Sequence, residues 1–488
     1  MRISAINWGD DSAERDPCLL DYFITSDAFD RLNNKSKSIV VGRKGSGKSA
    51  LRKKLEAGFA KDNETYVVNL SPSFNSIRNI LNDKDITDGG FGQEIFFQHT
   101  WLRQIYLDCL CQVGNGAKGK YVSESLEFAR KVAVELNRTS KDFVENVSDI
   151  LSKLKVKAGS LGEYGLALEK ELRNVAEVDS LQHHVASIAN SGAKFVILVD
   201  DLDLGWDNSL VANNLLLGLL SASSSLTALS DNIYVCVFLR EDVYSILITQ
   251  TQHSDKYRNI QPLRWTHENL IKMLNKRINF NRAKNELDHL PNPFHTVFPE
   301  TIGTSKTDNW MIERTLGRPR ELIQLARYYS ESVEDDVPDA DKLKASEIAY
   351  SSWKLDDLCT EYSNQYPNLI SIFSFWKTKY FRQKYHLKRP EIEDMLLRIA
   401  AEVNINTEWF NKIVEDVDLD RFLRILYEIG FIGDFVQGGQ GGSKTCYAYS
   451  DRHEPLFEEV QIHPCFRKAV NTVERIRSDR GSAPNPAS

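Results

Sequence analysis

Residues 42–51 read GRKGSGKSAL, and this stretch decides how the surrounding chain should fold. It has the spacing G-x-x-x-x-G-K-[ST], which cradles phosphates where a buried strand precedes it and a helix follows it. Both neighbours are present, because residues 39–41 (IVV) are β-branched and Leu51, Leu55 and Phe59 recur at helical spacing. The stretch therefore predicts a strand, a phosphate-binding loop and a helix whose positive N-terminal end faces the loop.

The loop itself supplies the predicted binding groups. Its glycines allow the backbone to fold closely around a phosphate, with several N–H groups pointing inward. We expect Lys48 to reach the β- and γ-phosphates and the Ser49 hydroxyl to coordinate Mg²⁺. The alternative is a glycine-rich turn that has this spacing by chance. The loop residues predicted to contact the nucleotide are Gly42, Arg43, Lys44, Gly45, Ser46, Gly47, Lys48, Ser49 and Ala50.

A second predicted element is an apolar strand that ends in acid. Residues 195–199 (FVILV) are all apolar, as in a strand buried on both faces, and Asp200, Asp201 and Asp203 follow them. We expect Asp200 to lie beside Ser49 and hold the metal, and Asp201 to orient or activate the attacking water. Asp203 either caps the next helix or lines the site. The alternative is an acidic turn after a core strand, but a bound Mg²⁺ would offset the repulsion among the carboxylates.

Two arginines complete the predicted site. Residues 232–242 (NIYVCVFLRED) form a third apolar strand, and Arg240 at its end lies where ligands bind in open α/β sheets. Arg240 would contact the γ-phosphate, unless it pairs with a neighbouring acid. In residues 313–329 (ERTLGRPRELIQLARYY) a helix should start near Arg320, so that Arg320 reaches the phosphates and Pro319 packs on the base. The alternative there is an ordinary turn between helices.

These segments, in this order, resemble the AAA+-related STAND and KAP groups of P-loop NTPases. GRKGSGKSAL is similar to their Walker A motif, FVILVDDLD to Walker B, VFLRED to a sensor-1 strand and GRPREL to a sensor-2 element. The resemblance implies an ATP- and Mg²⁺-dependent ATPase, with Lys48, Asp201, Arg240 and Arg320 in catalytic roles and Ser49 and Asp200 on the metal. Asp201 stands where relatives usually carry Glu, which favours a slow switch over a motor.

The fold class expected is α/β: a parallel sheet with flanking helices, a helical insertion, a helical lid and a C-terminal winged-helix-like domain. About 125 residues separate the second strand from the acidic strand, which implies the insertion. The predicted segments are the first part of the ATPase core (1–90), the insertion (91–190), the second part of the core (191–262), the lid (263–345), the winged-helix-like domain (346–478) and a disordered tail (479–488).

Composition excludes several classes. The net charge of −7 argues against a protein coated in basic surface for nucleic acid. The seven cysteines form no C-x-x-C pair, which favours a reducing cytoplasm over a zinc or disulfide framework. The first residues lack the apolar core of a signal peptide, and residues 213–229 are expected to be too short and too polar to span a bilayer. We therefore expect a cytoplasmic protein.

The sequence leaves three functions open. The leading one is an ATP-driven switch, which on the resemblance would serve prokaryotic defence or signalling with a protein partner or by self-association. The second is a DNA-binding initiator or regulator that uses the winged helix. Its recognition region is acidic, however, which disfavours contact with phosphates. The third is a scaffold that binds nucleotide without cleaving it. The resemblance implies ATP over GTP, and no guanine-reading N-K-x-D motif is evident.

Overall fold

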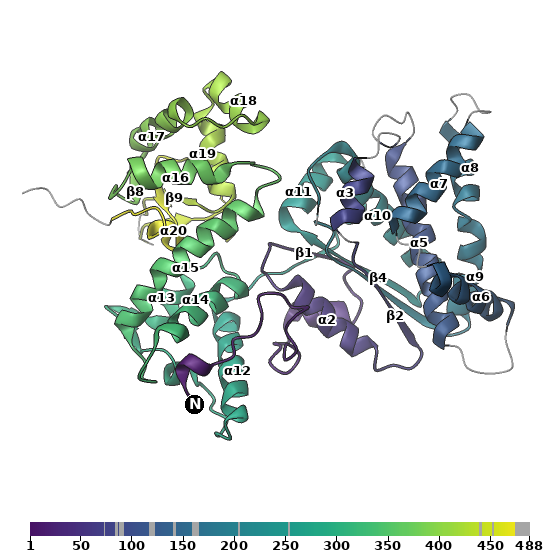
Figure 1. The fold of residues 1–488 in the computed structure, drawn as a ribbon, viewed down its shortest axis with the longest axis horizontal. Helices are drawn as coiled ribbons and strands as arrows, with labels where there is room; N and C mark the ends of the chain where they lie inside the picture. Colours follow the sequence, from purple (N-terminus) through teal and green to yellow (C-terminus); the bar gives the residue numbers. More distant parts are fainter. Residues whose placement is uncertain are drawn as a thin grey trace, which may run out of the picture. The chain divides into compact units, whose positions relative to one another are not determined.

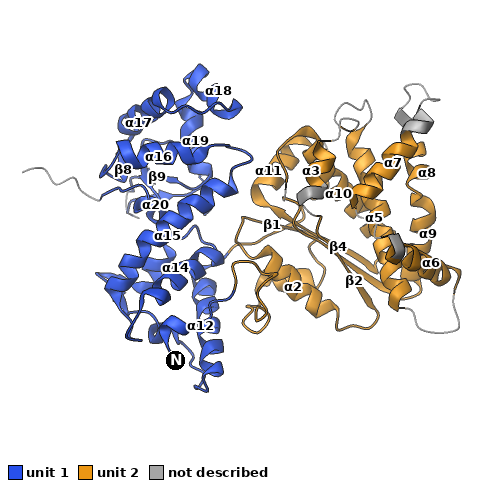
Figure 2. Ribbon diagram, in the orientation of Figure 1, with its two compact units in different colours: residues 1–9, 265–488 blue, residues 10–264 orange. Residues whose placement is uncertain are grey.

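The computed structural model shows that the chain folds into two compact units (Figures 1 and 2). Unit 1 comprises residues 1–9 and 265–488, and unit 2 comprises residues 10–264. Residues 1–9 thus pack with the C-terminal part of the chain, whereas the sequence assigned them to the ATPase core. The residues that the structure describes are 1–72, 74–82, 86, 92–116, 123–139, 143–158, 165–203, 205–251, 254–438, 442–450 and 453–473.

Unit 2 is built on a five-stranded parallel sheet with the strand order β2-β3-β4-β1-β5. The fold is therefore α/β, as the sequence predicts. The three apolar runs singled out in the sequence are the three adjacent central strands. The strands are β1 (Ile39–Gly42), β2 (Thr65–Leu70), β3 (Lys194–Val199), β4 (Ile233–Arg240) and β5 (Ile260–Pro262).

The strand order gives the sheet a topological switch point. From β1 the chain crosses β4 and β3 to reach β2, whereas from β4 it crosses β1 in the opposite direction to reach β5. Connections that leave two neighbouring strands in opposite directions define the switch point, where ligands bind in open α/β sheets. The switch point of this sheet lies at the carboxyl ends of β1 and β4. The loop after Gly42 and the side chain of Arg240 both start there.

Helices cover both faces of the sheet, because right-handed crossovers in opposite directions must lie on opposite faces (Figure 1). On one face Val196 and Leu198 pack with α1 and α2, and on the other Ile197 and Val199 pack with the remaining helices. The helices of this unit are α1 (Asp27–Asn33), α2 (Lys48–Phe59), α3 (Phe74–Leu81), α5 (Gln93–Gly116), α6 (Glu124–Thr139), α7 (Phe143–Ala158), α8 (Gly165–Val175), α9 (Val178–Asn190), α10 (Leu210–Leu229) and α11 (Glu241–Gln250).

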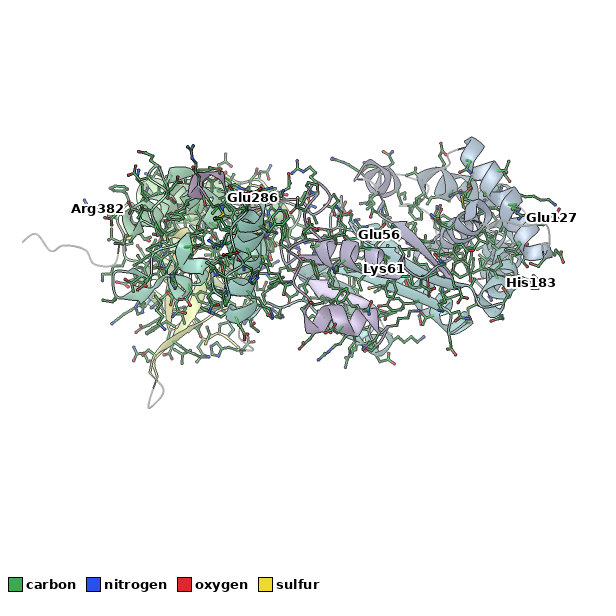
Figure 3. The ribbon with its side chains drawn as sticks, turned by 90° about the horizontal axis from the view of Figure 1, so that it is seen from below. Glu56, Lys61, Glu127, His183, Glu286 and Arg382 are labelled. Carbon is green, nitrogen blue, oxygen red and sulfur yellow. The ribbon has the colours of Figure 1, made fainter. Side chains whose placement is uncertain are left out.

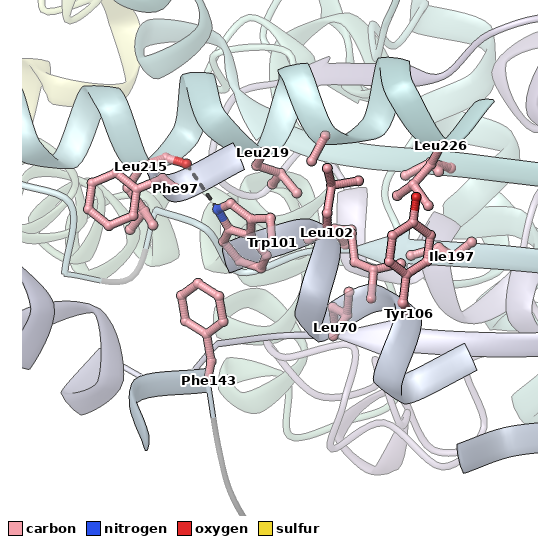
Figure 4. Close-up of a cluster of buried hydrophobic side chains, with 14 of the residues drawn as sticks. Leu70, Phe97, Trp101, Leu102, Tyr106, Phe143, Ile197, Leu215, Leu219 and Leu226 are labelled. Atoms are coloured by element: carbon pink, nitrogen blue, oxygen red, sulfur yellow. Dashed lines mark hydrogen bonds between the residues drawn. The ribbon is translucent and has the colours of Figure 1, made fainter. Parts of the chain in front are cut away.

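The predicted helical insertion is part of the core. Its first helix, α5, lies against α10 and the sheet, and the indole N–H of Trp101 donates to the Leu215 carbonyl at 3.0 Å (Figure 4). Phe96, Phe97 and Tyr106 on the same helix are each at most 1% exposed. These aromatic residues are packed core, as predicted, so this helix covers the sheet and does not project from it.

Helix α10 is the most apolar helix of the unit. It runs for 20 residues and is long and apolar enough to cross a membrane, although the sequence analysis judged residues 213–229 too short and too polar. That judgement was wrong on length, because the helix begins three residues earlier, after the Ser209 cap. Most of its apolar window is buried inside the unit, against α5 and β4. Burial on the sheet explains its composition.

Unit 1 combines helices with a four-stranded antiparallel sheet of order β10-β9-β11-β8 and a small hairpin. Its helices are α12 (His267–Lys284), α13 (Thr307–Ile312), α14 (Pro319–Ser332), α15 (Ala340–Glu361), α16 (Leu369–Lys379), α17 (Arg389–Glu402), α18 (Glu408–Asp416), α19 (Leu419–Glu428) and α20 (Pro464–Arg467). Its strands are β6 (Thr301–Ile302), β7 (Ser305–Lys306), β8 (His386–Lys388), β9 (Ile432–Val436), β10 (Lys444–Cys446) and β11 (Glu459–Ile462).

Two details of unit 1 differ from the sequence prediction. The expected boundary between lid and winged-helix-like domain, after residue 345, falls inside the continuous helix α15. The three expected helices and the hairpin β9–β10 are present, but β8 and β11 were not foreseen. These are short strands of mixed polarity that form only because each pairs with a partner distant in sequence. The boundary predicted at residue 90 and the tail 479–488 lie outside the described residues.

Candidate functional site

The loop between β1 and α2 adopts a conformation that only glycine tolerates well. Gly47 precedes the first residue of α2 with φ +94°, in the left-handed region. At Gly42 a Cβ would come within 2.5 Å of the Ser46 Oγ, so a larger residue would push the loop away from α2. The glycines therefore set a tight curl at the N-terminus of a 12-residue helix, where backbone N–H groups and the helix dipole favour an anion.

Lys48 lies over this loop. Its Nζ donates to the carbonyl oxygens of Gly42 at 3.0 Å and Arg43 at 3.4 Å. Burial lowers the pKa of Lys48, and the nearby carboxylates of Asp203 and Asp200 act in the opposite direction. The structure thus brings Lys48 and Asp200 together although 152 positions separate them in the sequence.

Asp200 and Ser49 form the predicted metal pair. Asp200 follows β3 and is 2% exposed, and the Ser49 side chain lies close enough to act on the pKa of its carboxyl group. Burial raises the pKa of Asp200, and the charges of Lys48 and Arg52 oppose that rise. A hydroxyl and a carboxylate are the hard oxygen donors that Mg²⁺ takes when substrate phosphates and water complete its shell. Among the described residues no three His, Cys, Asp or Glu side chains form a group that could hold a metal ion by themselves.

Asp201 has a strained backbone and a perturbed carboxyl group. Its φ of +60° lies in the left-handed region, which non-glycine residues rarely adopt and which concentrates at functional sites. Partial burial, followed by the charges of Asp200 and Glu14, raises the pKa of Asp201 to about 6. A carboxyl group with a pKa near 6 can exchange a proton close to neutral pH, as a general base must.

Arg240, 7% exposed at the end of β4, is held by acids. Its Nε and Nη2 donate to the two carboxylate oxygens of Asp242 at 3.0 and 2.6 Å, and its Nη1 lies 3.7 Å from Asp203. The local ion pair that the sequence analysis kept as an alternative is therefore present. The contact with Asp203 also connects Arg240 to the end of β3. Asp203 lies inside the cluster and does not cap α10, whose cap is Ser209.

The remaining loop residues surround the curl. Arg43, Lys44, Gly45 and Ala50 are partly buried, and Ser46 is 4% exposed. These residues form the rest of the loop and the start of α2.

Two charged residues at this site were missed by the sequence analysis. Arg52 lies one turn beyond Lys48 on α2 and is 8% exposed, and its Nε is 3.2 Å from the Asp200 Oδ2. Glu14, from the segment before α1, lies 3.6 Å from the Arg52 guanidinium. The position of Arg52, on the face that Leu51 and Leu55 bury, was a usable signal. Glu14 had no signal in the sequence, because only the fold brings its segment to the loop.

Arg320 and Pro319 belong to unit 1. Pro319 is the first residue of α14 and is buried, as a proline at this helix position often is. The Arg320 Nη1 is 3.6 Å from Asp357, and its guanidinium lies over the Trp353 ring. Their predicted contacts with nucleotide stay a prediction. The turn before them joins α13 to α14, with Gly317 at φ +71°.

A cavity of 390 Å³ lies in unit 1, apart from every predicted site residue. It is bounded by β9 and by Lys388, Leu456 and Glu459. It shares no residue with the cluster around Lys48, so it does not bear on the predicted chemistry.

Comparison with known sequences shows similarity to a domain family and to a bacterial protein. Residues 268–359 match the family model of the FunZ-associated C-terminal helical domain, a segment that runs from α12 through most of α15. The chain is also 23% identical over 501 residues to an Escherichia coli (strain K12) protein described as "Putative transposon gamma-delta 80.3 kDa protein". That alignment covers 95% of this chain and 67% of the relative.

Proposed function

We propose that this chain is a magnesium-dependent P-loop ATPase of the AAA+-related type that acts as a slow molecular switch. The observation that carries the proposal is the convergence of Lys48, Ser49 and Asp200 at the switch point of a parallel sheet. Two segments that lie far apart in the sequence, the loop before α2 and the end of β3, meet there. ATP is proposed over GTP on the resemblance alone.

Charge supports a metal-bound polyphosphate. The charged groups that act on Lys48 are the carboxylates of Asp203, Asp200 and Asp242 and the guanidinium of Arg240. Such an excess of negative charge beside Lys48 favours a divalent cation that also binds phosphate. Mg²⁺, when bound, would neutralise charge on the phosphate oxygens.

The residues of the chain have distinct roles in this proposal. Lys48 leaves its loop carbonyls to contact phosphate oxygens, and Ser49 and Asp200 hold the metal. Asp201 orients the attacking water and accepts its proton, because its pKa near 6 suits both steps. Arg240 exchanges Asp242 or Asp203 for the γ-phosphate, which would report whether ATP or ADP is present. The shorter side chain of Asp201 favours slow turnover.

The test is nucleotide binding and phosphate release in the wild type and in Lys48→Ala. We expect the wild type to bind a fluorescent ATP analogue with Mg²⁺ and to release phosphate, and Lys48→Ala to lose at least about a hundredfold in release. Lys61→Ala, an exposed lysine beyond the end of α2, is the matched control (Figure 3). Binding without any release would make the chain a nucleotide-binding scaffold. Equal phosphate release from the wild type and Lys48→Ala would rule out the proposed ATPase activity.

A second candidate function is DNA binding by the C-terminal part of unit 1. The strand order β8-β11-β9 with α17, α18 and α19 supports a winged-helix-like domain, and the relative from Escherichia coli is named for a transposon. Charge opposes it, because Arg424 on α19 pairs with Glu454 and Arg389 with Asp420. Between residues 408 and 430 the acids are Glu408, Glu415, Asp416, Asp418, Asp420 and Glu428, against Lys412, Arg421 and Arg424.

A gel shift at several salt concentrations separates the two candidates. A steep loss of DNA binding with salt would support the DNA-binding protein, because phosphate contacts release counterions. No shift at low salt would favour a protein partner, or self-association, for this domain. In that case we propose that the ATPase acts on a separate effector in prokaryotic defence or signalling. Size-exclusion chromatography with and without ATP tests self-association.

A further inference from the structure

Arg52 occupies the carboxylate that the proposed metal needs. Its Nε lies 3.2 Å from the Asp200 Oδ2, and the side chains of the two residues are 10% and 3% exposed. A guanidinium on a buried carboxylate stabilises the ionised form and satisfies a charge that would otherwise be costly to bury. Mg²⁺ and Arg52 would therefore compete for the Asp200 carboxylate.

Arg52 has two other carboxylates within reach. Its Nη2 lies 3.6 Å from Glu14 Oε1 and its Nη1 lies 3.6 Å from Glu56 Oε2. Glu56 is on α2 one turn further along (Figure 3), and both glutamates are partly exposed to solvent. The guanidinium can give up Asp200 and remain paired, so the exchange leaves no buried charge alone.

We propose that Arg52 is a displaceable internal counterion, which holds Asp200 until Mg²⁺ arrives and then moves onto Glu14 and Glu56. This inference rests on the proposed nucleotide site and names a regulation of it. Arg52 positions Asp200 in the metal-free chain and raises the Mg²⁺ concentration needed for nucleotide binding. Glu14 and Glu56 lower that requirement, because they accept the arginine.

The segment before α1 gains a role from this exchange. Lys53 Nζ donates to the backbone oxygens of Ala13 at 2.6 Å and Glu14 at 3.0 Å, which fixes the segment beside α2. Burial pushes the pKa of Glu14 upward, but its hydrogen bonds and the charges of Arg52 and Lys53 outweigh burial, and the net pKa is lowered. Glu14 therefore stays ionised and available to the arginine.

The experiment measures the Mg²⁺ concentration at half-maximal binding of a fluorescent ATP analogue, at one fixed pH and without following hydrolysis. Arg52→Gln should lower this midpoint by about tenfold, the size expected for one lost charge-assisted hydrogen bond. Glu14→Gln and Glu56→Gln should raise it, by about threefold each. Lys54→Gln, which removes one positive charge from the same helix, is the matched control and should leave the midpoint within a factor of two.

Two further variants separate the exchange from a general effect of charge or folding. Arg52→Lys keeps the charge and should restore most of the wild-type midpoint. In the Arg52→Gln background, Glu14→Gln should not change the Mg²⁺ midpoint further, because Glu14 acts on the metal site only through Arg52. An unchanged or raised midpoint in Arg52→Gln, with binding intact, would overturn the inference and leave the proposed function standing. If the wild type binds no nucleotide in the presence of Mg²⁺, both the proposed function and the inference about Arg52 are wrong.

Discussion

A cluster of buried charge in unit 1 and the cluster around Lys48 in unit 2 differ in the balance of their positive and negative charges. In unit 1, between α14 and α15, Lys354 contacts Glu321 at 2.8 Å and Asp357 at 3.1 Å, and Arg318 contacts Glu361 at 2.7 Å. With Arg320 included, three cations meet three carboxylates. In unit 2, carboxylates outnumber cations around Lys48, and one of them carries a left-handed backbone.

The difference teaches how to recognise a binding site among buried ion pairs. A balanced cluster needs nothing from outside, so its charges hold one helix against another. A cluster with excess negative charge, a raised carboxyl pKa and a strained backbone pays a standing cost in stability that a ligand can offset.

Lys354→Met should destabilise unit 1 severely. Lys354 is 0% exposed, and its loss would leave Glu321 and Asp357 buried with one partner fewer. Breaking a buried pair in this way costs about 3–5 kcal/mol of unfolding free energy. Thermal and guanidinium unfolding measure the loss, with Lys344→Met, an exposed lysine on the same helix, as the control. A loss below about 1 kcal/mol would show that the cluster is not structural.

Asp200→Asn should affect function far more than stability. The amide keeps the size of the side chain, but it is a weak metal ligand and loses the charge that faces Mg²⁺. We expect phosphate release to fall by about a hundredfold, equivalent to about 2.7 kcal/mol, while the unfolding midpoint changes little. Asp207→Asn, an exposed acid in the same loop, is the control. Unchanged release would mean that Asp200 holds no metal.

Asp201→Asn should remove a pH dependence of stability. The pKa of Asp201 is raised to about 6, above its value in the unfolded chain. Between about pH 4 and pH 6 the folded chain holds a proton that the unfolded chain has lost, so stability falls as pH rises through this window. After allowance for solvent screening, the unfolding free energy of the wild type should fall by about 1 kcal/mol more than that of Asp201→Asn between these two pH values. Denaturant unfolding in EDTA at both pH values measures this difference. The prediction is wrong if the wild type and Asp201→Asn change by the same amount with pH.

Arg424→Gln should have the smallest effect. Its pairing with Glu454 is exposed, and such pairs contribute about 0–1 kcal/mol. We expect an unfolding free energy within about 0.5 kcal/mol of the wild type. The same variant also distinguishes DNA from a protein as the partner of this domain. If α19 binds DNA, Arg424→Gln should lower the affinity for DNA at low salt.

Much of unit 2 could be predicted from the sequence. The apolar runs before Gly42, Asp200 and Arg240 can be buried only as central strands, and each became one within a residue or two at its ends. The glycine spacing before Lys48 required a tight curl at a helix start, and Gly45 and Gly47 both have positive φ. Local patterns such as these carry their own geometry, because the strand and helix periods determine which side chains share a face.

The rest depended on contacts between distant segments. No local pattern could place Glu14 beside Arg52, pair β8 with β11, or run α15 through the expected domain boundary. The helical insertion looked separable because its length is unusual, yet α5 covers the sheet.

By itself, the sequence determined the central strands of the sheet, the loop after Gly42 and the residues that we propose for phosphate binding, because burial and backbone conformation leave few alternatives for those patterns. Only the tertiary structure decided that Arg52 sits on Asp200 and that Arg240 pairs with Asp242 and Asp203. The physical reason is that a charge must be satisfied wherever folding buries it, and its partner is chosen by proximity in space.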